Sequence, residues 1–190
     1  MDRDLARVYQ EALAREPVQE ASNRLGERRL PPHEIIWSPQ EIDLENQYLQ
    51  FLLSYWRALP RVGDLPLAAS VDPLQMGPAL GNIVVSEVLD DGWDYRFRLF
   101  GSRIVDRFGK DLIGQRMSEA EFRSETKAFL IAVYLCVISK REAAFTAHIM
   151  REHPALLTWW RIILPLQNES GAVSRFLVGV VPVPRRLPSN

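Results

Sequence analysis

Residues 83–101 read IVVSEVLDDGWDYRFRLFG, and this stretch decides the fold. A β-branched run from Ile83 to Leu89 is followed by the turn signal Asp90-Asp91-Gly92, and residue types then alternate from Tyr95 to Phe100. Alternation with a period of two on either side of a short polar turn is typical of an antiparallel hairpin. The stretch therefore predicts two paired strands.

Downstream of the hairpin, a helical pattern gives way to further strand patterns. Residues 104–108 suit a short helix closed by Gly109, and Ser118 with Glu121 predicts the start of a long helix that runs to about Lys140. Three strand-like segments follow, at 142–150, 158–166 and 175–181. Two strands, a helical middle and three strands predict an α+β fold, with one five-stranded antiparallel sheet and covering helices.

Upstream of the hairpin, helical spacing predicts a first helix within residues 2–25, and the Gly- and Pro-containing stretch 26–37 reads as a linker. Ser38-Pro39-Gln40-Glu41 carries three start signals for a second helix, which Pro60 would end. Its apolar stripe comprises Ile42, Leu49, Leu52, Leu53 and Trp56. The expected organisation is an N-terminal helix and linker at 1–37, a domain with its leading helix at 38–184, and a tail at 185–190.

Composition excludes several classes of protein. Apolar residues make up 47% and charged residues 25% of the 190 residues, as in ordinary globular domains. The net charge of −1 offers no field for nucleic acid or an anionic membrane. The chain starts without a secretion signal and has a single cysteine, and its longest apolar run, 128–138, is shorter than the roughly 18 residues of a membrane span. We expect a cytoplasmic protein.

Residues for catalysis or metal binding do not form a recognisable set. His33, His148 and His153 with the lone Cys136 lack the spacing of a metal site, and surface or structural roles are the favoured interpretation of the histidines. No phosphate-binding loop, dinucleotide fingerprint or nucleophile elbow occurs. The sequence predicts no catalytic residues, no metal and no cofactor.

The predicted element order is that of PAS domains, and two segments carry a closer resemblance. Residues 95–101, YRFRLFG, followed by residues 109–115, GKDLIGQ, resemble the single-domain PAS-type family common in alphaproteobacteria, over about residues 45–182. The resemblance implies a sheet that encloses a cavity, with no attached kinase or cyclase, so that a signal would pass to a separate output protein. Haem is not expected, because the helix 119–140 contains no histidine, and Cys136 lies outside the region used in flavin photochemistry.

A pocket for a small-molecule ligand is the remaining candidate site. Alternation in the second strand separates Tyr95, Phe97 and Leu99 from Arg96, Arg98 and Phe100, and the sequence does not decide which face points inward. Arg98 is the polar residue expected to be more than half buried, with a carboxylate or carbonyl partner. The candidate pocket residues are Phe97, Arg98, Leu99, Phe108, Phe122, Phe129, Phe145 and Trp160. Ordinary core packing is the alternative and commoner role of such residues.

The function that these patterns favour is a non-catalytic PAS-like sensor or regulatory module that binds a small molecule or a protein partner. The alternatives are a small enzyme with an enclosed α+β cavity and a structural dimeric adaptor. A homodimer is expected, with a contact through the helix at 39–59 and the outer face of the sheet, where one ring of the Trp159-Trp160 pair would lie. A monomer whose helix folds back over its own sheet is the alternative.

Overall fold

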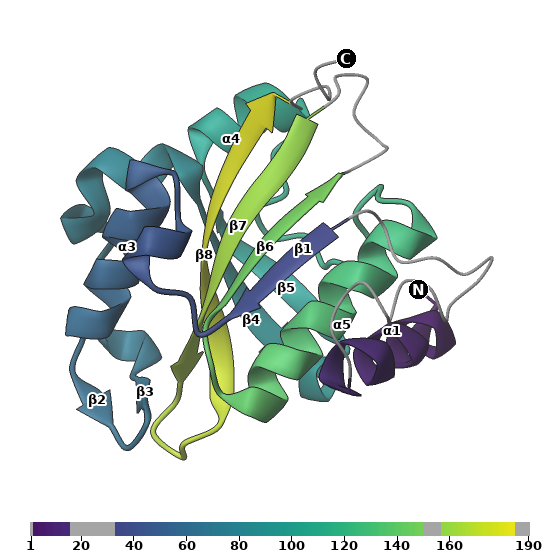
Figure 1. Ribbon diagram of the computed structural model, residues 1–190, viewed down its shortest axis with the longest axis horizontal. Helices are drawn as coiled ribbons and strands as arrows, with labels where there is room; N and C mark the ends of the chain where they lie inside the picture. The colour runs from purple at the N-terminus through teal and green to yellow at the C-terminus, as the bar shows by residue number, and fades with distance from the viewer. Residues whose placement is uncertain (1, 16–32, 150–156, 185–190) are drawn as a thin grey trace.

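The protein folds around one antiparallel sheet of six strands (Figure 1). The computed structural model describes residues 2–15, 33–149 and 157–184. The strands lie in the order β1-β6-β7-β8-β4-β5. Their bounds are β1 (His33–Trp37), β4 (Ile83–Leu89), β5 (Asp94–Phe100), β6 (Ala144–Ile149), β7 (Leu157–Gln167) and β8 (Val173–Pro184). The α+β class and the five predicted strands are confirmed, including the β4–β5 hairpin around the turn Asp90–Gly92.

The sixth strand, β1, occupies residues that the sequence analysis assigned to a linker. It pairs with β6, Ile35 opposite Thr146, and the amide of Ser38 donates to the carbonyl of Ala143 at 2.8 Å. Without β1, β6 would be an edge strand with unpaired backbone N–H and C=O groups. The backbone of β1 forms hydrogen bonds with these groups. The linker prediction was wrong for residues 33–37. The nearby prolines indicated a linker, and the short apolar run after them was not recognised as a strand. Residues 16–32 and 185–190, which hold the rest of that linker and the predicted tail, lie outside the described residues.

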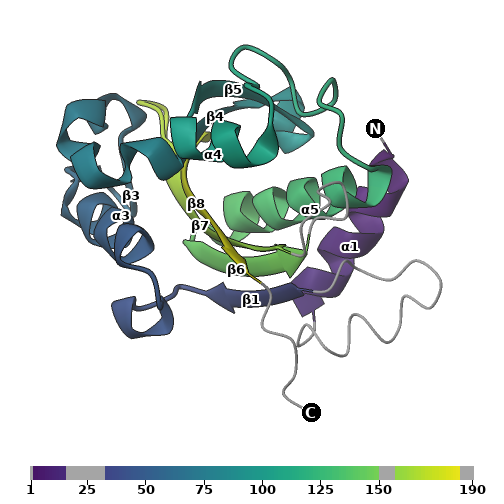
Figure 2. The same ribbon diagram turned by 90° about the horizontal axis from the view of Figure 1, so that it is seen from above.

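The long helix α5 (Ser124–Lys140) covers the concave face of the sheet, and α1 (Arg3–Arg15) covers α5 in turn (Figure 2). Every residue of α5 from Ala128 to Val137 is buried, almost three full turns. A helix that is apolar all round has to be covered all round. Tyr9 of α1 is fully buried, and the α1–α5 contact brings the Cys136 thiol to 3.7 Å from the carbonyl of Gln10. Among the described residues, no helix is both long and apolar enough to cross a membrane.

The start of α5 differs from the prediction, because Ser118 has another role. Its hydroxyl donates to the Asp94 carboxylate at 2.7 Å, and its amide donates to the same carboxylate at 3.1 Å. Asp94 is buried at the start of β5, so this contact holds the segment before α5 against the sheet. The predicted short helix is present as α4 (Ser102–Phe108), and Gly109 ends it with a φ of 80°.

The opposite face of the sheet carries α3 (Gln47–Ala58). The predicted start at Ser38 was wrong: residues Glu41–Asp43 form only a short 3-10 turn, η2, and the side chain of Asn46 caps α3. Ile42, expected in the apolar stripe, is 91% exposed. The turn does not continue as an α-helix because Leu44, which is buried, takes an extended conformation with φ −111° and ψ 106°.

The apolar stripe of α3 packs against its own sheet. Gly179 of β8 lets α3 approach, because a side chain there would meet Leu52 and Leu49 within 2.8 Å. The indole nitrogen of Trp56 donates to the carbonyl of Pro165 at 2.8 Å. The stripe that the sequence analysis expected in a homodimer contact is therefore buried within one chain, and the homodimer stays a prediction.

Hydrogen bonds of Arg141 connect the end of α5 with the small hairpin of β2 (Arg61–Val62) and β3 (Leu65–Pro66) and with the end of β7. Arg141 donates to the carboxylate of Asp64 at 2.6 and 2.7 Å and to Gln167 at 2.8 Å. Hydrogen bonds from Arg141 lower the pKa of Asp64 to about 2. Asp64 lies in that hairpin. The turns η3 (Ala68–Ser70) and η4 (Pro73–Asn82) then lead to β4.

Gly101, at the end of β5, is predicted to be intolerant of a side chain. A Cβ there would lie 2.3 Å from the carbonyl oxygen of Gly81, a backbone atom that cannot move aside. We expect Gly101→Ala to lower the free energy of unfolding by about 3 kcal/mol, measured by guanidinium denaturation. Gly77→Ala is the matched control, because nothing lies within 4 Å of a Cβ there, and its change should stay below about 1 kcal/mol. Equal stability of the two variants would contradict the packing described at Gly101.

Candidate functional site

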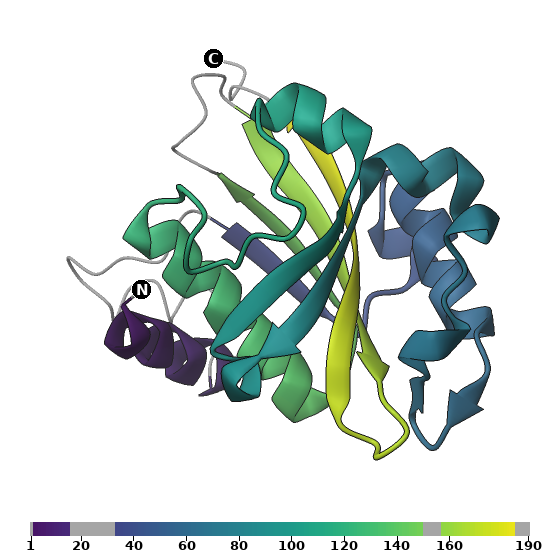
Figure 3. The ribbon, with the colours of Figure 1, turned by 180° about the vertical axis from the view of Figure 1, so that it is seen from behind.

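A cavity of about 60 Å³ lies between the concave face of the sheet and the helices α4 and α5. Strands β4 to β8, both helices and the segment between them contribute to its walls. That segment crosses the concave side of the sheet in Figure 3 and pairs with β5, where the Met117 amide donates to the Tyr95 carbonyl at 2.8 Å. The lining residues are Val84, Phe97, Phe100, Ile104, Phe108, Met117, Phe122, Leu130, Tyr134, His148, Trp159, Arg161 and Val180.

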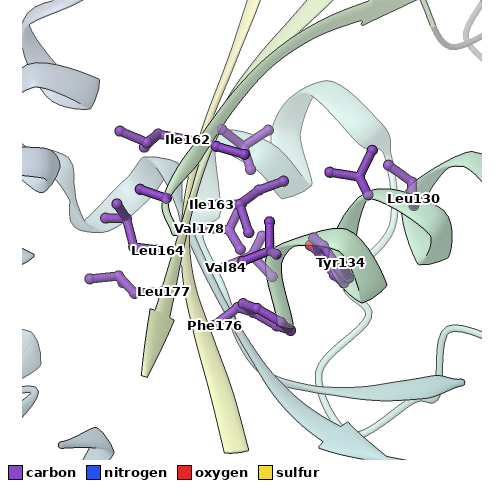
Figure 4. Packing of buried hydrophobic residues seen from close by; sticks show 14 of the residues in the cluster. Val84, Leu130, Tyr134, Ile162, Ile163, Leu164, Phe176, Leu177 and Val178 are labelled. Carbon is purple, nitrogen blue, oxygen red and sulfur yellow. The ribbon is translucent and has the colours of Figure 1, made fainter. Parts of the chain in front are cut away.

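The close-up in Figure 4 shows how the two faces of the sheet are divided. Val84, Phe176 and Val178 point to the side of Tyr134 and α5, whereas Leu164 and Leu177 point to the other side. Strand alternation therefore assigns odd-numbered residues of β7 and even-numbered residues of β8 to the cavity side. Trp159 and Trp160 point in opposite directions, as the sequence predicted: Trp159 is buried and lines the cavity, and Trp160 packs beside Phe145 at a ring distance of 6.2 Å.

Three of the predicted pocket residues line the cavity: Phe97, Phe108 and Phe122. The other five, Arg98, Leu99, Phe129, Phe145 and Trp160, do not line it. Phe145 and Trp160 lie on the outer face, opposite Ile162 and Ala147 in the strand register. Phe129 is fully buried in α5 and contacts the ring of His148 at 5.4 Å.

A β-bulge explains the positions of Arg98 and Leu99. The pairing shifts between Val85 opposite Leu99 and Ser86 opposite Phe97, which leaves Arg98 as the extra residue of β5. A bulge interrupts the alternation of side chains, so Phe97 and Phe100 both point inward although they are three residues apart. Simple alternation placed Phe100 on the face opposite Phe97 and so misjudged this strand.

Arg98 has the predicted kind of partner, but it does not line the cavity. Its guanidinium forms an ion pair with Glu87 of β4 at 2.6 Å, and its side chain remains 46% exposed. Because Glu87 and Arg98 lie on the outer face, Arg98 is the wrong candidate for the polar anchor of the cavity.

The polar anchor is Arg161 of β7, which the sequence analysis did not single out. Arg161 is 8% exposed, and its Nη2 donates a hydrogen bond to the hydroxyl of Tyr134 on α5. Its Cζ lies 5.3 Å from the centre of the Tyr134 ring, a cation–π distance. Arg161 has no carboxylate partner among the residues that the structure describes. The sequence gives only a weak indication of this role. An arginine within the apolar strand β7 points to a buried charge only when the inward face of the strand is known.

Two other polar side chains lie on the neighbouring strand β6, and of these His148 lines the cavity whereas Thr146 does not. Thr146 is opposite Arg161 in the register and His148 is opposite Trp159, so both point to the concave side. Both are 1% exposed. The hydroxyl of Thr146 has no hydrogen-bond partner in the described part of the chain. One end of an otherwise apolar cavity is therefore polar and carries a positive charge.

A row of aromatic rings forms the other end of the cavity. The ring centres are 5.6 Å apart from Phe97 to Phe100, 6.2 Å from Phe100 to Phe108 and 5.3 Å from Phe108 to Phe122. Phe100, Phe108 and Phe122 are only partly buried. We call these three residues the aromatic wall, and it is where the cavity lies nearest to solvent.

The size of the cavity limits what it can hold. Sites for drug-sized molecules and organic cofactors measure roughly 300–1,000 Å³, whereas this cavity measures about 60 Å³. A flavin or haem does not fit it in this form. Cys136 does not line it, and burial raises the pKa of its thiol to about 11. Within residues 2–15, 33–149 and 157–184 no cluster of three metal-ligating side chains occurs, and His153 lies outside these ranges.

Comparison with known proteins identifies a family. No curated protein matches this chain. A solved structure described as that of an RNA-binding Light-Oxygen-Voltage receptor is 12% identical with a TM-score of 0.44. It covers 87% of this chain but 44% of its own, so this chain spans less than half of that protein, and so distant a likeness carries no argument. A family profile described as PAS domain matches residues 45–181, more than half of the sequence, and the chain belongs to the PAS domain family.

Proposed function

We propose that this PAS domain protein is a non-catalytic sensor module whose cavity receives a small molecule. Membership of the PAS family supports a sensory role in general. The observation that carries the finer proposal is Arg161, a guanidinium that lines an apolar cavity while 8% exposed. Burying a charge is costly unless a partner offsets the lost hydration. A ligand that pairs with Arg161 would supply that offset.

The packing of α5 suggests how binding would change the protein. Leu130 and Tyr134 of α5 line the cavity, and the same helix holds α1 on its other side through the contact of Cys136 with Gln10. A ligand that binds more tightly to one position of α5 therefore also favours one arrangement of α1. Such a difference in affinity between two conformations is what a sensor needs. A separate output protein would then read the surface around α1.

The enzyme alternative lacks a carboxylate among the described residues that line the cavity. General acid–base catalysis needs titratable side chains that converge on the substrate. Among the described lining residues, Tyr134 and His148 are of types that can transfer protons, but the Tyr134 hydroxyl already accepts a hydrogen bond from Arg161. The arrangement favours binding over chemistry.

The adaptor alternative has one observation in its favour. A cavity of about 60 Å³ is small enough to be a packing defect in a core that side chains otherwise fill. An adaptor would bind nothing in the cavity and would act through its surface alone. The homodimer and the separate output protein remain predictions from the sequence, and a dimer would need a surface other than the buried stripe of α3.

Filling the cavity separates the sensor from the adaptor. Val180 faces Arg161 across β7 and β8 and lines the cavity, so Val180→Leu would take up space there. We expect a panel of small acids, amides and alcohols to contain compounds that raise the thermal midpoint of the wild type saturably, and Val180→Leu to abolish that shift. Val181→Leu is the matched control, because the neighbouring side chain points to the outer face, and it should respond like the wild type. A panel that stabilises none of the three proteins supports the adaptor and overturns the sensor.

A double-mutant cycle tests whether Arg161 is kept for stability. Tyr134→Phe keeps the ring stacked on Phe176 at 4.7 Å but removes the acceptor of Arg161, which should lower the free energy of unfolding by about 1–3 kcal/mol. Adding Arg161→Met removes the buried charge, so the double variant should recover that loss in urea denaturation. A double variant less stable than Tyr134→Phe alone would show that Arg161 serves the fold instead of a ligand.

A further inference from the structure

We propose that the ligand of the cavity is a small carboxylate monoanion whose two oxygens pair with Arg161. This inference rests on the proposed function, since it names the class of molecule that the same cavity would hold. It starts from the charge of the site. An arginine guanidinium stays charged in proteins, and no carboxylate of the described residues lines the cavity or contacts Arg161. The site as it stands therefore carries a positive charge that no described group neutralises.

The hydrogen bonds of Arg161 point to the same class of ligand. A guanidinium has five N–H donors arranged as a planar fork, and the described structure uses one of them, toward Tyr134. A carboxylate accepts two parallel hydrogen bonds from such a fork, whereas an amide or alcohol accepts fewer and brings no charge. The Thr146 hydroxyl, opposite Arg161 in the register, has no hydrogen-bond partner among the described residues, but it does not line the cavity and is not counted as a donor to the ligand.

Size selects within the class of carboxylates. A cavity of 150 Å³ is enough for benzene, so about 60 Å³ suits roughly two to four non-hydrogen atoms. Formate and acetate are of this size. Dicarboxylates and phosphate esters are too large and carry charges for which a single Arg161 is not sufficient. Because Phe97 and Phe100 form the opposite end of the cavity, a short hydrocarbon end is favoured, and acetate fits better than the wholly polar nitrate.

The test compares acetate with acetamide, which has the same shape without the charge, and with nitrate, a planar monoanion without a methyl group. Each is titrated at constant ionic strength, and binding is followed by NMR through the methyl groups of Val84, Leu130 and Val180. We expect acetate to bind saturably to the wild type, nitrate more weakly, and acetamide at least about tenfold more weakly than acetate, the ratio expected for loss of a charge-assisted hydrogen bond.

Two arginine variants locate the binding. Arg161→Met combined with Tyr134→Phe, which leaves neither partner unpaired, should weaken acetate binding at least about tenfold. Arg161→Lys serves if that double variant does not fold, because it keeps a charge but loses the planar fork, and weaker acetate binding is expected there too. Arg98→Met is the matched control: it also removes an arginine charge, but from the exposed ion pair with Glu87, and it should bind acetate like the wild type.

The outcomes separate this inference from the proposed function. Acetamide binding as tightly as acetate, or undiminished acetate binding after loss of the Arg161 guanidinium, overturns the carboxylate and leaves a cavity that binds neutral molecules. If nitrate binds more tightly than acetate, the carboxylate inference is overturned and the site is one for inorganic anions. If none of the three probes shifts the methyl resonances at concentrations up to about 50 mM, the carboxylate inference fails. The panel with Val180→Leu then decides independently whether the cavity binds anything.

Discussion

The structure depends on the burial of α5 on both of its sides. Ten consecutive buried residues, from Ala128 to Val137, cannot be covered by a sheet alone, so the helix needs α1 on one side and the concave sheet on the other. This constraint places Tyr134 over the centre of the sheet and makes α1 part of the same core. The N-terminal helix is therefore a structural layer of the domain.

The cavity is a consequence of how that helix meets the sheet. The bulge at Arg98 turns both Phe97 and Phe100 inward, and their rings continue through the aromatic wall toward solvent. At the other end, Arg161 places a charge where apolar packing would cost less. A core that fills space efficiently has no need of a buried guanidinium with a single hydroxyl partner. The ligand proposal rests on this exception to ordinary packing, since departures from local rules are expected at functional sites.

Local sequence patterns predicted most of the fold but only part of the site. The β4–β5 hairpin, the three later strands and the glycine after α4 follow from periodicity and turn chemistry, which act within a few residues. Three features depended on distant partners: Ser118 bonds to Asp94 instead of capping α5, the run 33–37 finds the open edge of β6, and α3 begins only at Asn46. Arg161 could not be chosen over Arg98, because a bulge and the location of α5 decide which side chains face inward.

The claim that most needs a direct measurement is that the Arg161 guanidinium forms the ligand contact inside the cavity. Nitrogen NMR of arginine side chains can observe its Nε–H group, assigned by its absence from the spectrum of Arg161→Lys. The account predicts a resonance that exchanges slowly with water in the free protein, because Arg161 is 8% exposed, and that shifts saturably with acetate but not with acetamide. A resonance that exchanges as fast as those of surface arginines, or that acetate leaves unmoved while the cavity methyl groups respond, would contradict it.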